Sequence, residues 1–131
     1  MRLFCLAILL VSTACARGEY TKVEYRVPMR DGVKLYTIVY IPKDASDANR
    51  YPILLKRTMF SVAPYGDAYP KVLGPNAYVM RDKYIFAYQD IRGRYMSEGT
   101  FVVMRPYVAD SISEASDAES LPACRIIRRP I

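Results

Sequence analysis

The run Tyr84-Ile85-Phe86-Ala87-Tyr88 leads directly into Gln89-Asp90-Ile91-Arg92-Gly93-Arg94-Tyr95-Met96-Ser97-Glu98-Gly99. A short apolar run of this kind predicts a strand buried in a sheet. The stretch after it is charged and contains glycines, which is typical of a loop. Because open α/β sheets place ligand-facing residues at the carboxyl ends of their strands, residues 89–99 are predicted to form a loop at the functional edge of such a sheet.

The N-terminal part of the chain predicts a hairpin. Residues 20–29 alternate apolar and polar side chains, as in a strand with one buried face. Asp31-Gly32 then predicts a type I′ turn, which requires positive φ. Residues 33–41 are largely apolar on both faces, which places this second strand deeper in the sheet. Pro42 ends it, because proline cannot donate to a ladder.

A pair of parallel strands is predicted next. Ile53-Leu54-Leu55 is a continuous apolar run, of the kind found in a strand covered on both faces. Asn76 can cap a short helix that ends at about Lys83, before the strand at 84–88. Parallel strands need a crossover of about a dozen residues or more, and residues 57–83 provide it. The predicted order is an antiparallel hairpin, then strand, helix and strand.

Several blocks of this sequence resemble one family of secreted serine hydrolases, which includes the X-Pro dipeptidyl-peptidases, the cocaine esterases and the α-amino-acid ester hydrolases. Residues 89–99 are similar to its D-x-R-G-x-x-x-S-E-G stretch, and residues 27–35 to its M-R-D-G opening. Residues 40–42 and 51–55 are similar to its second and third strands. The likeness covers about residues 20–118. It implies an α/β fold, the N-terminal portion of an α/β-hydrolase sheet that is incomplete in this chain.

We call residues 89–99 the signature loop. The positions that match the family pattern are Asp90, Arg92, Gly93, Ser97, Glu98 and Gly99. We interpret the charged ones, together with Arg94, as anchors that pin the loop to the sheet through mutual ion pairs. Gly93 and Gly99 are expected to supply positive φ where the chain reverses. Asp31-Gly32 is interpreted as a turn without a direct role.

The resemblance implies a Ser-His-Asp hydrolase, in which a serine on a G-x-S-x-G turn attacks an ester or amide carbonyl. The sequence has no histidine and no serine between glycines at that spacing. Ser61 and Ser97 lie in loops predicted at the functional edge, but neither has an evident base to remove its proton. No catalytic residue is therefore identified in the chain.

One position that the resemblance connects with catalysis does fall within this sequence. The loop after the third strand reads R-T-P-Y in relatives, and its tyrosine hydroxyl is implied to donate to the oxyanion of the tetrahedral intermediate. Here the stretch is Arg57-Thr58-Met59-Phe60, so the oxyanion-donor position holds Phe60. Tyr65 is a possible substitute donor, although its spacing differs from that of the family.

Residues 1–16 predict an export signal, with an apolar core at 3–11 and an A-x-A site that ends at Ala16. Cleavage near Ala16 is favoured over acylation of Cys15, because Ser12 stands where a lipoprotein signal needs an aliphatic residue. The expected location is therefore periplasmic or secreted.

Charge and composition argue against several classes of partner. The formal charge of +6 owes much to Arg2 and to the arginines of residues 125–129, and it forms no basic stripe, so nucleic-acid binding is not expected. The apolar core of the leader is too short to span a bilayer. No metal or other cofactor is expected, because histidine is absent and Cys124 is the one cysteine beyond the leader.

The expected organisation is a leader at 1–16, the N-terminal part of a hydrolase domain at 17–118 and an atypical tail at 119–131. The tail does not resemble the family, so we hypothesise a frameshift or an early stop in the gene, or a mispredicted gene model, near codon 118. The predicted function is a truncated, exported serine hydrolase, inactive alone, whose intact relatives hydrolyse small ester, amide or peptide substrates. The alternative is a small exported binding protein whose tyrosines and Phe60 form a contact patch.

Overall fold

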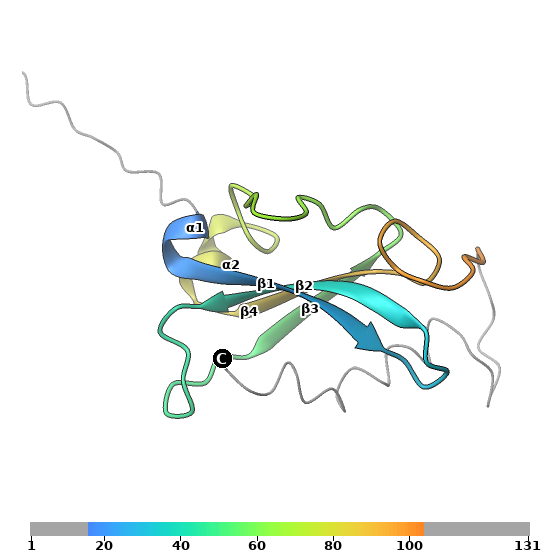
Figure 1. Ribbon diagram of the computed structural model, residues 1–131. Helices are drawn as coiled ribbons and strands as arrows, with labels where there is room; N and C mark the ends of the chain where they lie inside the picture. Colours follow the sequence, from blue (N-terminus) through green and yellow to red (C-terminus); the bar gives the residue numbers. More distant parts are fainter. Residues whose placement is uncertain (1–15, 104–131) are drawn as a thin grey trace, which may run out of the picture.

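The computed structural model describes residues 16–103, which contain a mixed four-stranded sheet (Figure 1). The strands lie side by side in the order β1-β2-β4-β3. None of the helices in this range has the length and apolar character that a bilayer crossing requires. In chain order the elements are α1 (Ala16–Glu19), β1 (Tyr20–Pro28), β2 (Lys34–Pro42), β3 (Ile53–Thr58), α2 (Ala77–Arg81) and β4 (Ile85–Asp90).

The predicted hairpin is confirmed, since β1 and β2 pair antiparallel from Tyr20↔Pro42 to Pro28↔Lys34. The predicted turn type is wrong. The Met29 N–H donates to the Val33 carbonyl (2.8 Å) and the Gly32 N–H to the Met29 carbonyl (3.0 Å), which makes a three-residue connection. Of the central residues only Gly32 has positive φ (84°), as in a type I turn followed by a glycine bulge.

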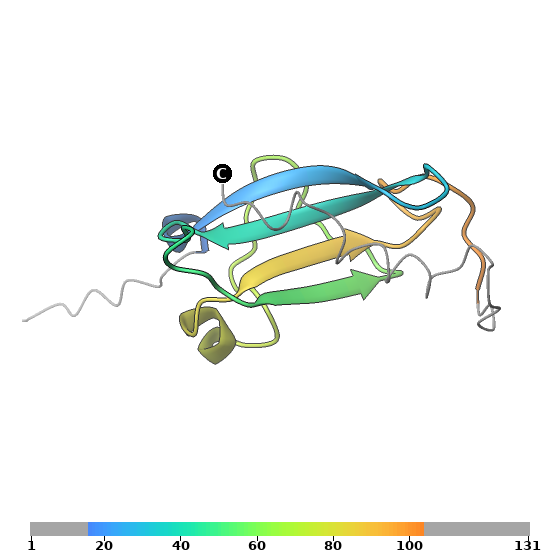
Figure 2. The ribbon, with the colours of Figure 1, turned by 90° about the horizontal axis from the view of Figure 1, so that it is seen from below.

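The strand–helix–strand unit is confirmed as well. Strands β3 and β4 run parallel, from Ile53↔Ile85 to Thr58↔Asp90, and the crossover between them includes α2 (Figure 2). The Asn76 side chain accepts hydrogen bonds from the backbone N–H groups of the first turn of α2, as predicted for its cap. The helix ends at Arg81 rather than Lys83, and Lys83 has a φ of 55° that ends the helical path.

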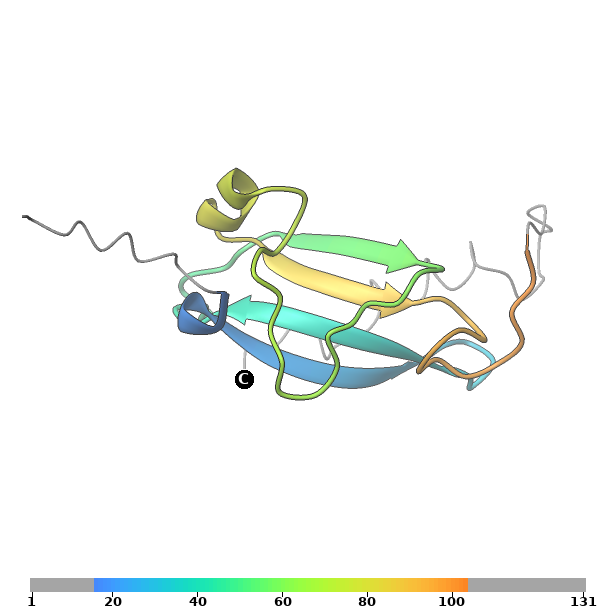
Figure 3. The same ribbon diagram turned by 90° about the horizontal axis from the view of Figure 1, so that it is seen from above.

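The core lies on the face of the sheet that the crossover covers (Figure 3). Strand β2 is an interior strand, as predicted, and its residues 35–40 are all buried. Phe86 of β4 packs against the same side chains, and Leu73 and Met80 contact them from the crossover. The buried members of this cluster are Tyr20, Tyr36, Ile38, Tyr40, Val62, Leu73, Met80 and Phe86.

The prediction that Ile53-Leu54-Leu55 is covered on both faces is wrong in this chain. These side chains are 45%, 38% and 39% exposed. The cause is the position of β3: within residues 16–103 it is the outermost strand of the sheet and pairs only with β4. A continuous apolar run is compatible with a central strand or an edge strand, so its pattern does not distinguish the two.

Candidate functional site

The candidate site is the edge of the sheet where β3 and β4 both end. Because the two strands are parallel, Thr58 and Asp90 lie at the same edge, and the arrowheads of β3 and β4 point the same way in Figure 2. The loop that starts at Met59 and the signature loop both leave from here. The structure therefore brings Phe60 and the signature loop to one edge of the sheet, where the resemblance implies catalytic chemistry.

Asp90 is fully buried and joins the two loops. One carboxylate oxygen accepts a hydrogen bond from the Val62 N–H (3.0 Å), and the other accepts one from the Tyr65 hydroxyl (2.9 Å). Its backbone carbonyl accepts a third from the Ser97 hydroxyl (2.7 Å). Asp90 thus fixes the start of the signature loop and the loop after β3 at the same time.

The Ser97 hydroxyl both donates and accepts a hydrogen bond. It donates to the Asp90 carbonyl and accepts from the Tyr36 N–H at 2.8 Å. A hydroxyl has one proton to donate, and here that proton is held by a carbonyl oxygen. The geometry gives Ser97 the role of tying the loop to β2.

Glu98 extends this attachment along β2. Its N–H donates to the Lys34 carbonyl (3.0 Å), and its side chain accepts from the Lys34 N–H (3.0 Å). The Glu98 carbonyl accepts from the Gly93 N–H at 2.9 Å, which closes the loop on itself. The Glu98 carboxylate therefore contacts the backbone of the hairpin, a partner that the predicted network of ion pairs did not include.

Arg92 makes a two-pronged contact with Asp31 in the hairpin turn. The Nη1–Oδ2 and Nη2–Oδ1 distances are 2.7 and 3.2 Å, and both side chains are mostly buried. Asp31, interpreted from sequence as a turn residue only, therefore also holds the signature loop. Its charge, opposite to that of the loop arginines, was the one signal in the sequence that pointed to this contact.

The Asp31–Arg92 pair predicts an acid-sensitive contribution to stability. The hydrogen bond from Arg92 holds the pKa of Asp31 below its ordinary value of 3.8. A depressed folded-state pKa means that the contribution is present above the unfolded value and is lost as the pH falls through the folded one. The stability difference between wild type and Asp31→Asn, measured by urea unfolding, should therefore be largest above pH 3.8 and shrink below it. Asp47→Asn, at an exposed aspartate, is the control variant. If the stability difference between wild type and Asp31→Asn stays constant through the acid range, the assignment is contradicted.

The predicted positive φ is confirmed at Gly93 (68°) and Gly99 (91°). A Cβ at Gly93 would lie 2.1 Å from the backbone nitrogen of Phe101, and one at Gly99 would lie 2.8 Å from Cγ of Arg92. Arg94 lies over the ring of Phe101, with 4.8 Å from its Cζ to the ring centroid. The loop is therefore closely packed as well as hydrogen-bonded.

Phe60 lies at this edge with 71% of its surface exposed. Its backbone N–H donates to the Thr58 hydroxyl at 3.0 Å, and its ring has no group that can donate to an oxyanion. A pocket of about 210 Å³ is lined by Lys56, Ser61 and Tyr88 among others, and Phe60 is not one of its lining residues.

The geometry does not favour Tyr65 as a substitute oxyanion donor. Its single phenolic proton is donated to Asp90, and its oxygen lies 2.8 Å from the Ser61 hydroxyl. Burial raises the pKa of Tyr65, and the neighbouring Asp90 carboxylate raises it further. The hydroxyl therefore stays protonated and committed to Asp90. Ser61, which also accepts the Ala63 N–H at 3.0 Å, has no base beside it in this arrangement.

No group of three or more His, Cys, Asp or Glu side chains within residues 16–103 is placed to hold a metal ion. The export signal up to and including Cys15, together with Cys124 and the atypical tail, lies outside the residues that the structure describes.

Comparison with known proteins identifies the family. The family model of the X-Pro dipeptidyl-peptidase (S15 family) matches residues 31–120. An α-amino acid ester hydrolase labelled with selenomethionine is similar, with a TM-score of 0.67 and 30% identity over 83% of this chain and 19% of its own. An aminopeptidase from the marine sediment archaeon Thaumarchaeota archaeon gives a TM-score of 0.69 and 30% identity over 86% of this chain and 20% of its own. No curated protein matches.

The chain thus spans about a fifth of the length of these two solved structures. Its mixed sheet corresponds to a small part of an α/β-hydrolase structure. The family match takes in more than half of the chain, from Asp31 in the hairpin turn through the signature loop. The chain therefore belongs to the X-Pro dipeptidyl-peptidase (S15) family.

Proposed function

We propose that this chain is the N-terminal part of a serine hydrolase that cleaves small ester, amide or peptide substrates by acyl transfer to water. The observation that carries the proposal is the junction at Asp90, which holds the signature loop and the loop of Phe60 at one edge of the sheet. In this reading the chain supplies the oxyanion side of an active site. The nucleophile and its base would come from a part of the hydrolase that this sequence does not contain.

We further propose that the chain alone does not catalyse hydrolysis. A serine nucleophile needs a base that removes its proton, and the sequence contains no histidine. The hydroxyls of Ser97 and Ser61 are both engaged in local hydrogen bonds. A reading-frame change near codon 118 remains our explanation for the tail. Translation of the other two frames tests it, and the absence of both a D-W-L helix and a G-x-S-Y-x-G elbow downstream would contradict it.

A segment replacement tests the proposed function. Residues 20–103 of this chain would replace the matching segment of the α-amino acid ester hydrolase, to which the chain is 30% identical. The chimera should fold and hydrolyse an ester substrate slowly, because Phe60 lacks the donor implied at this position. A soluble, folded chimera without any turnover, including after Phe60→Tyr, contradicts the proposal.

The alternative, a binding protein with a tyrosine-rich contact patch, finds less support. Tyr20, Tyr36 and Tyr40 are buried in the core, where they pack with further tyrosines of the crossover and β4. Tyr78 and Tyr95 are exposed, at 74% and 53%, but they belong to separate segments, α2 and the signature loop. Most of the described tyrosines therefore pack in or against the core between the sheet and the crossover, and they do not form one exposed surface.

Export is the last part of the proposal, and it predicts a processed N-terminus. Cleavage near Ala16 should give a mature chain that starts at Arg17, because the A-x-A site ends there. Intact-mass analysis of protein from the periplasm or the medium measures this start directly. Acylation of Cys15 would instead leave the mature chain beginning at that residue with a lipid-sized mass increase.

A further inference from the structure

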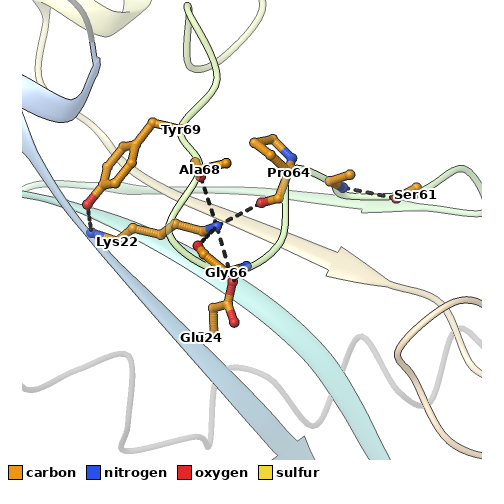
Figure 4. Close-up of polar contacts among 8 residues, drawn as sticks. Lys22, Glu24, Ser61, Pro64, Gly66, Ala68 and Tyr69 are labelled. Carbon is orange, nitrogen blue, oxygen red and sulfur yellow. Dashed lines mark hydrogen bonds and ion pairs between the residues drawn. The ribbon is translucent and has the colours of Figure 1, made fainter.

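Lys22 of β1 buries its ammonium group against the crossover (Figure 4). The side chain is 3% exposed. Its Nζ donates to the carbonyls of Pro64 (2.7 Å), Gly66 (2.6 Å) and Ala68 (3.1 Å). Glu24 supplies a carboxylate oxygen 3.1 Å from the same nitrogen. An ammonium has three protons to donate, and here four protein oxygens lie within 3.1 Å of its nitrogen to accept them.

Three carbonyls of residues 64–68 converge on this charge. Carbonyl dipoles that point at one centre repel one another, and a buried cation removes the repulsion. The surrounding contacts complete the attachment to β1. Glu24 accepts from the Gly66 N–H at 2.8 Å, and the Tyr69 hydroxyl accepts from the Lys22 N–H at 3.0 Å.

Glu24 stays ionised in this cluster. Burial by itself would raise its pKa, but hydrogen bonds from Tyr36, Lys22 and the Gly66 backbone together hold the pKa below its ordinary value. The ammonium is therefore both hydrogen-bonded and charge-balanced, which a buried cation requires.

The loop that Lys22 holds also carries Tyr65 to the candidate site. Tyr65 lies between two of the residues whose carbonyls bind the ammonium, Pro64 and Gly66. Its ring packs edge-on against Tyr36 at 5.5 Å, and its hydroxyl donates to Asp90 at 2.9 Å. A change in the path of residues 64–68 would move this hydroxyl away from the carboxylate that joins the two loops.

We propose that Lys22 is a positioning residue: its ammonium sets the path of residues 64–68 and, through Tyr65, holds Asp90 and the edge that bears Phe60. The link from Lys22 to Asp90 runs through the carbonyls of Pro64 and Gly66 and the hydroxyl of Tyr65. Its relevance to catalysis rests on the proposed function.

The test uses the full chain with Lys22→Met, which keeps an unbranched side chain and removes the charge. The pKa of the Tyr65 phenol, followed by NMR of labelled tyrosine, should fall toward its ordinary value of 10.0 as contact with Asp90 is lost. Exchange of the Gly66 N–H should accelerate by about tenfold or more, because its bond to Glu24 is no longer held in place. Lys71→Met, at an exposed lysine of the same crossover, is the matched control and should change neither value.

A folded Lys22→Met chain with an unchanged Tyr65 pKa and unchanged Gly66 exchange overturns the proposal. If the variant fails to fold, proton exchange is measured on the wild-type chain instead. The Lys22 ammonium should exchange its protons with water much more slowly than the Lys71 ammonium. Equal exchange rates for the two ammonium groups overturn it. None of these readouts needs turnover, so a chimera without activity would contradict the proposed function and leave this inference standing.

Discussion

Phe60→Tyr in the segment-replacement chimera is expected to raise kcat/KM for an ester substrate by about 10²–10³-fold. Removing one oxyanion donor typically costs about that factor, and the substitution would restore the donor that the family resemblance implies at this position. Phe60 is exposed at the carboxyl edge, so the added hydroxyl would be accessible and would not create a new buried polar group. Initial rates with a p-nitrophenyl ester, taken over a range of concentrations, separate kcat from KM.

The matched control is Met59→Tyr, which adds a tyrosine at the neighbouring exposed position. It should leave the rate within a few fold of the parent chimera. A rise of the same size in both variants, or none in Phe60→Tyr, contradicts the role given to residue 60.

Asp90→Ala is expected to destabilise the chain by about 1–3 kcal/mol or more, because it leaves one buried donor without an acceptor and such a donor costs about that much. That donor is the Val62 N–H; the part-buried Tyr65 hydroxyl loses the same acceptor but keeps the Ser61 hydroxyl at 2.8 Å. Urea unfolding of the full chain measures the change in the free energy of unfolding.

Two milder variants calibrate that result. Tyr65→Phe removes one donor together with its bond, so it should cost only about 0.5–1.5 kcal/mol. Asp90→Asn retains an acceptor for the Val62 N–H and should fall between the two. An Asp90→Ala chain that is no less stable than Tyr65→Phe shows that Asp90 does not join the two loops.

Local rules were enough to predict most of the fold. The hairpin, the Asn76 cap and the parallel pair follow from alternation, capping and crossover length, each of which acts over a few residues. The turn type was wrong because the three-residue connection places only Gly32 at positive φ. The prediction that Ile53-Leu54-Leu55 is covered on both faces was wrong because burial depends on how many strands lie beyond β3, a property of the whole sheet.

The candidate site was only partly predictable for a related reason. The signature loop is contiguous, so its sequence identified the family and its place in the sheet. Its partners lie far away along the chain: Arg92 contacts Asp31 across 61 positions, and Lys22 contacts the crossover across more than 40. Such pairings depend on the three-dimensional path of the chain, and a single sequence carries no spacing rule for them.

The most direct test of the central claim, that this chain supplies the positioning edge of a hydrolase and no nucleophile, is a hydrolysis assay on the purified full chain. The substrates are p-nitrophenyl acetate and Gly-Pro-p-nitroanilide. We predict a rate indistinguishable from the buffer blank. Turnover that persists through purification and is lost in Ser61→Ala or Ser97→Ala would contradict the claim.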